Sequence, residues 1–412
     1  MTTAISNVRV FDGERVRDAT TVVIDGPEIT SVGGEVPKGA DVIDGSGGTL
    51  LPGLIDAHVH TSEQGLALAL RFGVTTELEM QGTWTKPRRA RLATDDSRAD
   101  VRSAGFGLTP PGGHPSELFP ADARPGDDGE PVDDADNPEA AGIVMPFVTT
   151  PHEAVAAVAR LVESGSDYIK FMIDDGTVEG HPGLPVLDQA TVAAGVAEAH
   201  RHGMLTVAHA LTLDATRMAV EAGIDGLAHL FMDVPHTDEI IELIAQSGAF
   251  VVPAVVLDAS MMGLTGADFA ADPRVASRLD DAWLSTLRSC YGRYPQGELT
   301  DVLASVKALH DAGVDIVAGT DASFPATFLG GVAHGASVHH ELQYLVRAGL
   351  TPVEALRAAT ATPARRFALT DRGRVAPGMR ADLLLVDGDP TTAIRDTLNL
   401  RSVWRRGTRL LS

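Results

Sequence analysis

The central part of the chain alternates short apolar segments with alanine-rich stretches of helical spacing, such as 151–165 and 188–203. Eight of the apolar segments have the length of a strand, and they span residues 51–60, 73–82, 101–110, 167–174, 205–210, 225–230, 249–256 and 314–322. Strands that alternate with helices pair in parallel, so the pattern predicts an α/β protein built on a (β/α)8 TIM barrel. In such a barrel, the reactive residues lie at the C-terminal ends of the strands.

The two ends of the chain follow a different pattern. Residues 1–51 and 373–412 contain short apolar runs separated by Gly and Asp, which is typical of β-hairpins. We expect these two segments to combine in one small β-sandwich domain, while residues 52–372 form the barrel. A chain of 412 residues is long enough for both.

Composition restricts the partners and the compartment. The formal net charge of −23 argues against nucleic acid and anionic membranes, because binding to either requires a basic surface. Cys290 is the only cysteine, so an internal disulfide and a cysteine-based zinc site are excluded. No signal peptide precedes the first strand, and no apolar run reaches the roughly 18 residues of a membrane span. We expect a cytoplasmic protein that forms a homo-oligomer.

Two histidines stand at the end of the first apolar segment of the barrel. His58 and His60 are separated by one residue, and alternate side chains of a strand point the same way. Two imidazoles at the end of a buried strand make half of a metal site. The alternative is a chance pair of histidines at a strand end.

Four more residues that can serve a metal centre occupy later strand ends: Lys170, His209, His229 and Asp321. Each alone has an ordinary interpretation, as a core histidine, a helix cap or a lysine that reaches solvent. A barrel brings all eight strand ends around one axis, so together these groups would converge.

Lys170 requires a chemical explanation, because it lies in an apolar strand of a chain that has only four lysines. A buried ammonium group is costly and cannot bind a metal ion. A neutral lysine amine can react with CO₂ to form a carbamate, whose oxygens could bridge two cations. Four imidazoles, one carboxylate and one carbamate suit two divalent ions, most simply Zn²⁺, with Mn²⁺, Fe²⁺ or Co²⁺ as alternatives.

This set of six residues resembles the binuclear branch of the amidohydrolase superfamily. Three further segments, 109–114 (TPPGGH), 345–367 and 373–390, are similar to imidazolonepropionase-like and Xaa-Pro dipeptidase (prolidase-like) members. The resemblance implies one metal ion on His58, His60 and Asp321, a second on His209 and His229, and a carbamylated Lys170 between them. It also implies that a metal-bridged hydroxide attacks the substrate, and that Asp321 carries the proton to the leaving nitrogen.

Several other residues have open roles. His114 follows the third strand in a Gly-Gly-His turn and is a candidate for a contact with the substrate or the oxyanion, or for a purely structural role. Glu77 and Glu79 share one face of the second strand, where they could pair with a cationic substrate or form internal hydrogen bonds. A group of residues that follow the fourth and eighth strands could likewise contact the substrate or be ordinary turn, loop or helix residues: Asp174, Asp175, His181, His334, His339 and His340.

Two connections are too long for simple loops, namely 110–146 and 257–298. Both leave the face that carries the strand ends, so they could form a lid or a substrate wall, or be peripheral insertions. The acidic run from Asp127 to Asp136 is typical of a solvated loop.

We interpret the chain as a metal-dependent hydrolase of a small-molecule amide, such as a dipeptide, an N-acyl amino acid or a cyclic or xenobiotic amide. A group of apolar residues near the strand ends favours a substrate with a hydrophobic portion: Phe171, Leu211, Leu230, Phe231 and Met232. Hydrolysis of a carbamate, urea or ester on the same site is an alternative. Deaminases of this superfamily generally keep one metal ion, lack the lysine of the fourth strand and carry a glutamate near the fifth. The resemblance therefore disfavours deamination, because Lys170 is present and the segment after His209 has no glutamate. A non-catalytic scaffold is a remote alternative, because all six residues are retained.

Overall fold

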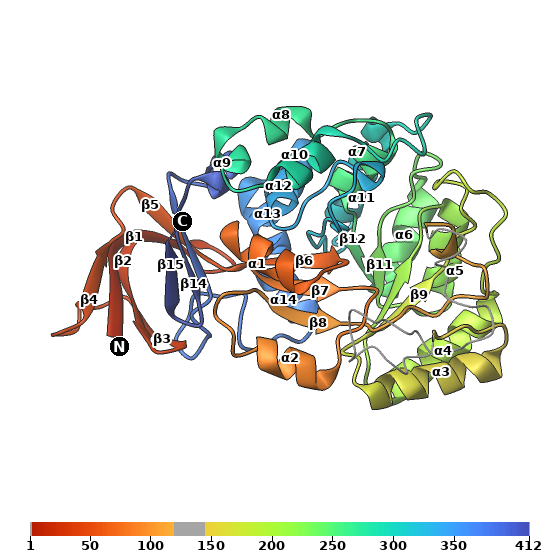
Figure 1. Cartoon of the computed structure of the whole chain (residues 1–412), viewed down its shortest axis with the longest axis horizontal. Coiled ribbons are helices and arrows are strands. Elements are labelled where there is room, and N and C mark those ends of the chain that lie inside the picture. The colour runs from red at the N-terminus through yellow and green to blue at the C-terminus, as the bar shows by residue number, and fades with distance from the viewer. Residues whose placement is uncertain (1, 119–144, 412) are drawn as a thin grey trace.

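The computed structural model describes residues 2–118 and 145–411 of a mixed α/β protein. A β-rich part lies at one end of the molecule, and the helices gather around the strands of the other part (Figure 1). The acidic run from Asp127 to Asp136 and most of the 110–146 connection lie outside the described residues. Among the helices of the described chain, none is long and apolar enough to cross a membrane.

Strands from both ends of the chain form one eight-stranded sheet. Its strands are β1 (Thr2–Phe11), β2 (Val16–Asp25), β3 (Glu28–Val32), β4 (Asp41–Asp44), β5 (Gly48–Pro52), β13 (Leu383–Asp387), β14 (Leu400–Arg405) and β15 (Thr408–Leu411). The order is β15-β14-β13-β5-β1-β2-β3, and β4 also pairs with β1. Leu385 of β13 pairs with Leu50 of β5, so the C-terminal strands continue the N-terminal sheet. Side chains of both ends, including Ile5 and Trp404, share one core.

The middle of the chain contributes seven parallel strands. The first three, β6 (Leu54–Val59), β7 (Val74–Glu79) and β8 (Asp100–Ser103), form one sheet, and β9 (Ile169–Met172), β10 (Thr206–His209), β11 (Gly226–Ala228) and β12 (Phe250–Val252) form another. The eighth expected segment, 314–322, is not a regular strand, but isolated parallel bridges join it to β12 at Ile316 and to β6 at Ala322. A further bridge between Leu108 and Phe171 links the two sheets. All pairings are parallel, so the C-terminal ends lie on one side.

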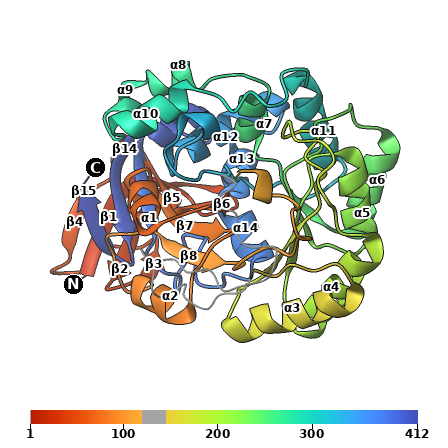
Figure 2. The same ribbon diagram turned by 45° about the vertical axis from the view of Figure 1, so that its right-hand side comes forward.

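The helices follow the strands in sequence and lie around them (Figure 2). They are α1 (Glu63–Arg71), α2 (Lys86–Leu92), α3 (Pro151–Ser164), α4 (Gln189–Arg201), α5 (Leu213–Glu221), α6 (Asp238–Ser247), α7 (Val255–Met261), α8 (Ala267–Ala270), α9 (Pro273–Ala276), α10 (Asp281–Arg288), α11 (Leu299–Asp311), α12 (Ala336–Ala348), α13 (Pro352–Ala358) and α14 (Ala361–Arg366). The sequence defines several starts, as at α3, where Thr150 and Glu153 form a reciprocal capping box. The long connection 257–298 is folded into helices, because most of α7 and all of α8, α9 and α10 lie within it.

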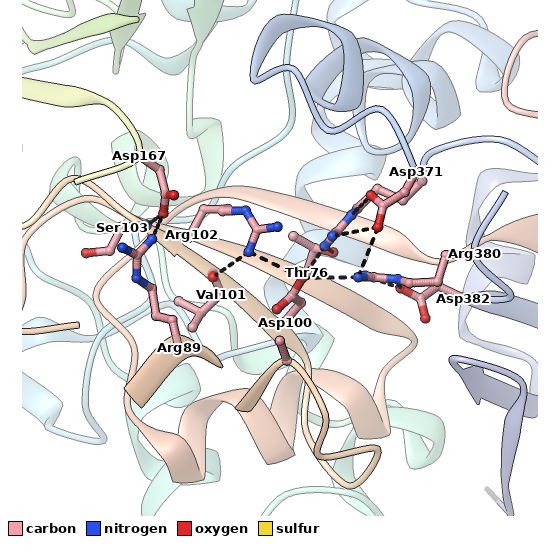
Figure 3. Close-up of polar contacts among 12 residues, drawn as sticks. Thr76, Arg89, Asp100, Val101, Arg102, Ser103, Asp167, Asp371, Arg380 and Asp382 are labelled. Atoms are coloured by element: carbon pink, nitrogen blue, oxygen red, sulfur yellow. Dashed lines mark hydrogen bonds and ion pairs between the residues drawn. The ribbon is translucent and has the colours of Figure 1, made fainter. Parts of the chain in front are cut away.

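A buried network of arginines and aspartates joins the terminal sheet to the other strands (Figure 3). Asp100, at the start of β8, accepts a hydrogen bond from Arg372 at 2.5 Å and one from Arg380 at 3.2 Å. Burial alone would raise the pKa of Asp100, but the guanidinium groups of Arg372 and Arg102 outweigh it and hold that pKa well below its usual range. Asp382 pairs with Arg405 at 3.3 Å. These contacts lie at the amino end of β8, away from the strand ends expected to carry the chemistry.

Candidate metal centre

The structure brings the six predicted residues to one cavity. His58 lies on β6 and His60 just beyond it, Lys170 lies on β9, and His209 ends β10. Of the remaining two, His229 directly follows β11, and Asp321 lies near the end of the bridged segment 314–322. All except His229 line a cavity of about 560 Å³, and the His229 ring lies 4.6 Å from the His58 ring and 4.7 Å from the His209 ring.

The carboxylate of Asp321 contacts both histidines of the first pair, His58 and His60. Its Oδ1 atom lies 3.1 Å from His58 Nε2 and 2.9 Å from His60 Nε2. Burial would raise the pKa of Asp321, but the two imidazoles lower it well below its ordinary value. Asp321 is therefore held as a carboxylate whose oxygen faces two potential metal ligands.

Several buried polar atoms of this group have no hydrogen-bond partner among the described residues: His58 Nδ1, both ring nitrogens of His229 and Lys170 Nζ. Buried donors and acceptors are normally paired, because an unpaired one loses its hydration without compensation. Cations bound by the imidazoles and the carboxylate would supply the missing partners. The donor set thus fits divalent metal ions.

Lys170 is the least expected member of the cluster, because its side chain is 1% exposed. Burial lowers its pKa to about 7, so a large share of the amine is neutral near pH 7. A neutral amine is the form that reacts with CO₂, and this is what a bridging carbamate requires.

Two compact groups of donor atoms can each surround one ion. The first is His58, His229 and Asp321, and the second is His114, Glu179 and His209. This grouping differs from the one implied by the family resemblance, which places His60 with the first ion and His229 with the second. Which atoms bind which ion stays a prediction.

The backbone around these ligands is held in unusual conformations. His229 and Asp321 have positive φ angles of 72° and 59°, which non-glycine residues rarely adopt. Such conformations cost about 1–3 kcal/mol and are concentrated at functional sites. Asp56, fully buried beneath His58, receives hydrogen bonds from the Thr320 hydroxyl at 2.6 Å and from the Thr320 amide at 3.1 Å. This contact fixes the segment that ends in Asp321.

His114 lies between two carboxylates that the sequence did not reveal. Its Nδ1 atom is 2.6 Å from Glu117 Oε1 and 2.6 Å from Glu179 Oε2, and its ring stacks on His209 at 4.2 Å. Burial would lower the pKa of His114, but Glu179 and Glu117 raise it well above its ordinary value. Burial also raises the pKa of Glu179 to about 8. No local pattern marks these glutamates, because Glu179 comes from the connection after β9.

The residues with open roles separate in the structure. Asp174 is buried, with Oδ2 3.3 Å from His209 Nε2. Asp175 is exposed and accepts a hydrogen bond from the Thr177 amide, as a turn residue does. Asp174 therefore faces one ring nitrogen of a predicted metal ligand, whereas Asp175 does not reach the site.

Glu77 and Glu79 have internal partners. Glu77 pairs with His334 Nδ1 at 2.8 Å, and Glu79 accepts a hydrogen bond from Ser103 at 2.8 Å. Glu79 also lies 4.0 Å from His60 Nδ1 and orients that ring. Neither glutamate lines the cavity, and the same holds for His181, which is exposed, and for His334, His339 and His340, which contact other parts of the fold.

The apolar wall of the cavity comes from other residues than those expected. Phe171, Leu211, Leu230, Phe231 and Met232 are buried in the core and do not line the cavity. The wall is instead made by residues of α7 and of the segment after Asp321: Leu257, Met261, Phe324, Phe328, Leu329 and Val332. The expectation of a hydrophobic pocket is met, but by segments whose placement depends on tertiary packing.

The fold and this cluster define a metal-dependent hydrolase, and sequence comparison supplies the family. The profile of the Amidohydrolase family matches residues 49–410. The chain therefore belongs to the amidohydrolase family, and it is a metal-dependent hydrolase that acts on carbon–nitrogen bonds.

Curated relatives match either most of the chain or parts of it. A protein of Mycobacterium tuberculosis is 28% identical over 363 residues, which are 86% of this chain and 83% of that protein. An adenine deaminase of Methanoregula boonei is 44% identical over 66 residues, which are 16% of this chain and 12% of that protein. An imidazolonepropionase of Deinococcus deserti is 38% identical over 108 residues, 25% of this chain and 26% of that protein. The chain thus aligns with about an eighth and about a quarter of the length of the last two proteins.

Solved structures match along the whole chain. A Xaa-Pro dipeptidase with bound methionine superposes with a TM-score of 0.75 at 23% identity, covering 100% of both chains. The ochratoxinase of A. niger superposes with a TM-score of 0.76 at 21% identity, covering 100% of this chain and 96% of that one. These similarities show that the fold is shared with a Xaa-Pro dipeptidase and with the ochratoxinase.

Proposed function

We propose that this protein hydrolyses an amide bond of a small molecule with two divalent metal ions held at the C-terminal ends of the strands. The observation that carries the proposal is the convergence of His58, His60, Lys170, His209, His229 and Asp321 in one place, with buried polar atoms that lack partners. A cluster of this composition has no structural use without cations, because each unpaired buried group is destabilising.

We assign the ligands to two ions as the family resemblance implies, because that assignment includes His60 and Lys170, which line the cavity and which the two compact groups leave out. His58, His60 and Asp321 would hold one ion, His209 and His229 the other, and a carbamate on Lys170 would bridge them. The ions, Zn²⁺ or alternatively Mn²⁺, Fe²⁺ or Co²⁺, would supply an activated water and polarise the scissile carbonyl.

Two residues of the chain would handle the proton and the carbonyl oxygen. Asp321 is a carboxylate in the cavity, so it can accept the proton of the attacking water and deliver it to the leaving nitrogen. The C–N bond then breaks, and a carboxylic acid and an amine are released. His114 has its Nδ1 atom engaged by Glu117 and Glu179, which leaves Nε2 to donate a hydrogen bond to the substrate carbonyl oxygen.

We further propose that the seven strands and segment 314–322 close as a (β/α)8 barrel over residues 52–372. The bridges at Leu108, Ile316 and Ala322 support this closure. Residues 1–51 and 373–412 would act as one β-sandwich module, supported by the core that their strands share. Assembly as a homo-oligomer stays a prediction.

Lys170→Ala tests the proposal directly. The wild-type protein, purified without chelator, should contain about two equivalents of metal by elemental analysis and hydrolyse members of an amide panel. The variant should lose most of its metal and activity, because the bridging group is removed. Acetate or propionate should partly restore both, since a free carboxylate can enter the space left by the carbamate. Full metal content and activity in the variant would contradict the bridging role.

A further inference from the structure

The mouth of the cavity carries two exposed aromatic rings. Phe324 and Phe328 line the cavity and are 55% and 54% exposed, more than any other large apolar side chain of the described chain. Their ring centroids lie 6.0 Å apart at an interplanar angle of 64°, an edge-to-face arrangement. Solvent-exposed phenylalanines at the rim of a pocket are typical of a surface that a ligand covers.

The exposed pair continues an apolar wall that runs into the cavity. Leu257 and Met261 are four residues apart on α7, so they lie on the same face of that helix and both line the cavity. Val332 extends the wall on the side of Phe328. Imidazoles and carboxylates line the other part of the cavity. A bound molecule would thus meet metal ligands with one part and apolar side chains with the other.

Charge decides which molecules fit. A substrate carboxylate would lack a free cationic side chain to bind, because among the described lining residues there is no arginine. Lys170 is buried and assigned to the metal centre, and the imidazole of His114 already lies between two carboxylates.

One arginine lies close to the site without lining it. The guanidinium carbon of Arg293 is 5.5 Å from the ring centroid of Tyr291, whose side chain does line the cavity. Arg293 is exposed to solvent. Arg293 is therefore the cationic residue to substitute if the protein prefers an anionic substrate.

We propose that Phe324 and Phe328 select an uncharged amide that carries an aromatic or branched apolar group, and that the cavity disfavours substrates with a carboxylate next to the amide. This inference rests on the proposed function, because it concerns the substrate class of the same site. The apolar group covers the two rings, and the amide reaches the metal ligands.

A matched pair of substrates tests the selection. N-acetyl-2-phenylethylamine and N-acetylphenylalanine differ only by a carboxylate, and N-methylacetamide lacks the apolar group. On the zinc-loaded protein, the neutral phenyl compound should have a kcat/KM at least about tenfold above that of its carboxylate counterpart. Phe324→Ala and Phe328→Ala should each raise its KM about tenfold, the effect of losing contact with a ring, and so reduce the difference in kcat/KM between it and N-methylacetamide. Leu264→Ala is the control, because Leu264 is 46% exposed and does not line the cavity.

Binding of compounds that cannot be hydrolysed separates this inference from the proposed function. N-(2-phenylethyl)methanesulfonamide and N-methanesulfonylphenylalanine reproduce the pair, and calorimetry gives their Kd values. The inference is supported if the neutral compound binds more tightly and if both phenylalanine variants weaken that binding. If, in addition, no amide is hydrolysed, only the proposed function is overturned. The inference is overturned if the anionic compound binds more tightly and this preference is lost in Arg293→Ala. It is also overturned if the Kd values are unchanged in both phenylalanine variants.

Discussion

Gly319 lies where a side chain cannot fit, and Gly319→Ala is therefore a sharp test of how the metal centre is held. A Cβ atom at this position would lie 2.5 Å from Val252 Cγ1 and 3.0 Å from both the Cβ and the backbone nitrogen of His58. Ordinary contacts begin at 3.4 Å, so Val252 must retreat by about 0.9 Å and His58 by about 0.4 Å. The carbonyl of Val252 accepts the His229 amide at 2.8 Å, so movement of Val252 is passed to a second predicted ligand.

The expected cost follows from these displacements. Overpacking of a close-packed interior lowers the free energy of unfolding by about 1–3 kcal/mol. A shift of roughly 1 Å in a catalytic group can reduce turnover about 100-fold. We therefore expect Gly319→Ala to fold, to unfold a few degrees below the wild type, and to lose metal and at least about 100-fold in kcat/KM.

The assay compares thermal unfolding, metal content and turnover in the variant and in a control. Gly45→Ala is the control, because its Cβ would lie 2.6 Å from Val8 Cβ of β1 in the terminal sheet, away from the metal ligands. The control should lose stability but retain metal and activity. Normal metal content and turnover in Gly319→Ala would refute the claim that this contact sets the position of His58.

Two further predictions concern single charged groups. Asp321→Asn should keep the fold and some metal but lose several orders of magnitude in kcat, because the proton carrier and one ligand are removed together. Circular dichroism, elemental analysis and steady-state kinetics measure these three properties. Turnover at the wild-type rate would exclude Asp321 as the proton carrier. Asp100 has a lowered pKa in the folded state, so its contribution to stability is present above about pH 4 and is lost as the pH falls toward the folded value. Asp100→Asn should cost about 3–5 kcal/mol at pH 7 and flatten the acid part of the stability curve, measured by urea unfolding between pH 3 and 7. An equally steep acid loss in the variant would show that other carboxylates control it.

The sequence by itself predicted the parallel strands, the combined terminal sheet and the residues that converge at the strand ends. Apolar strand-length segments that alternate with helical stretches predict parallel strands, and seven of the eight expected strands are present in the described chain. The type of residue at each strand end shows which groups can bind metal, because alternation fixes the face of His58 and His60 and burial makes Lys170 exceptional. These signals are local, so they are readable without a structure.

Tertiary structure decided how the site is enclosed. The carboxylates beside His114 come from the short helix at 116–118 and from the connection after β9, and the apolar wall comes from α7 and the segment after Asp321. Glu77 shares a strand with the site but turns to His334, 257 positions away. The periodicity of apolar residues indicates which face of a strand or helix is buried. Which residues pack against that face depends on contacts between distant parts of the chain, and the local sequence carries no pattern for those contacts.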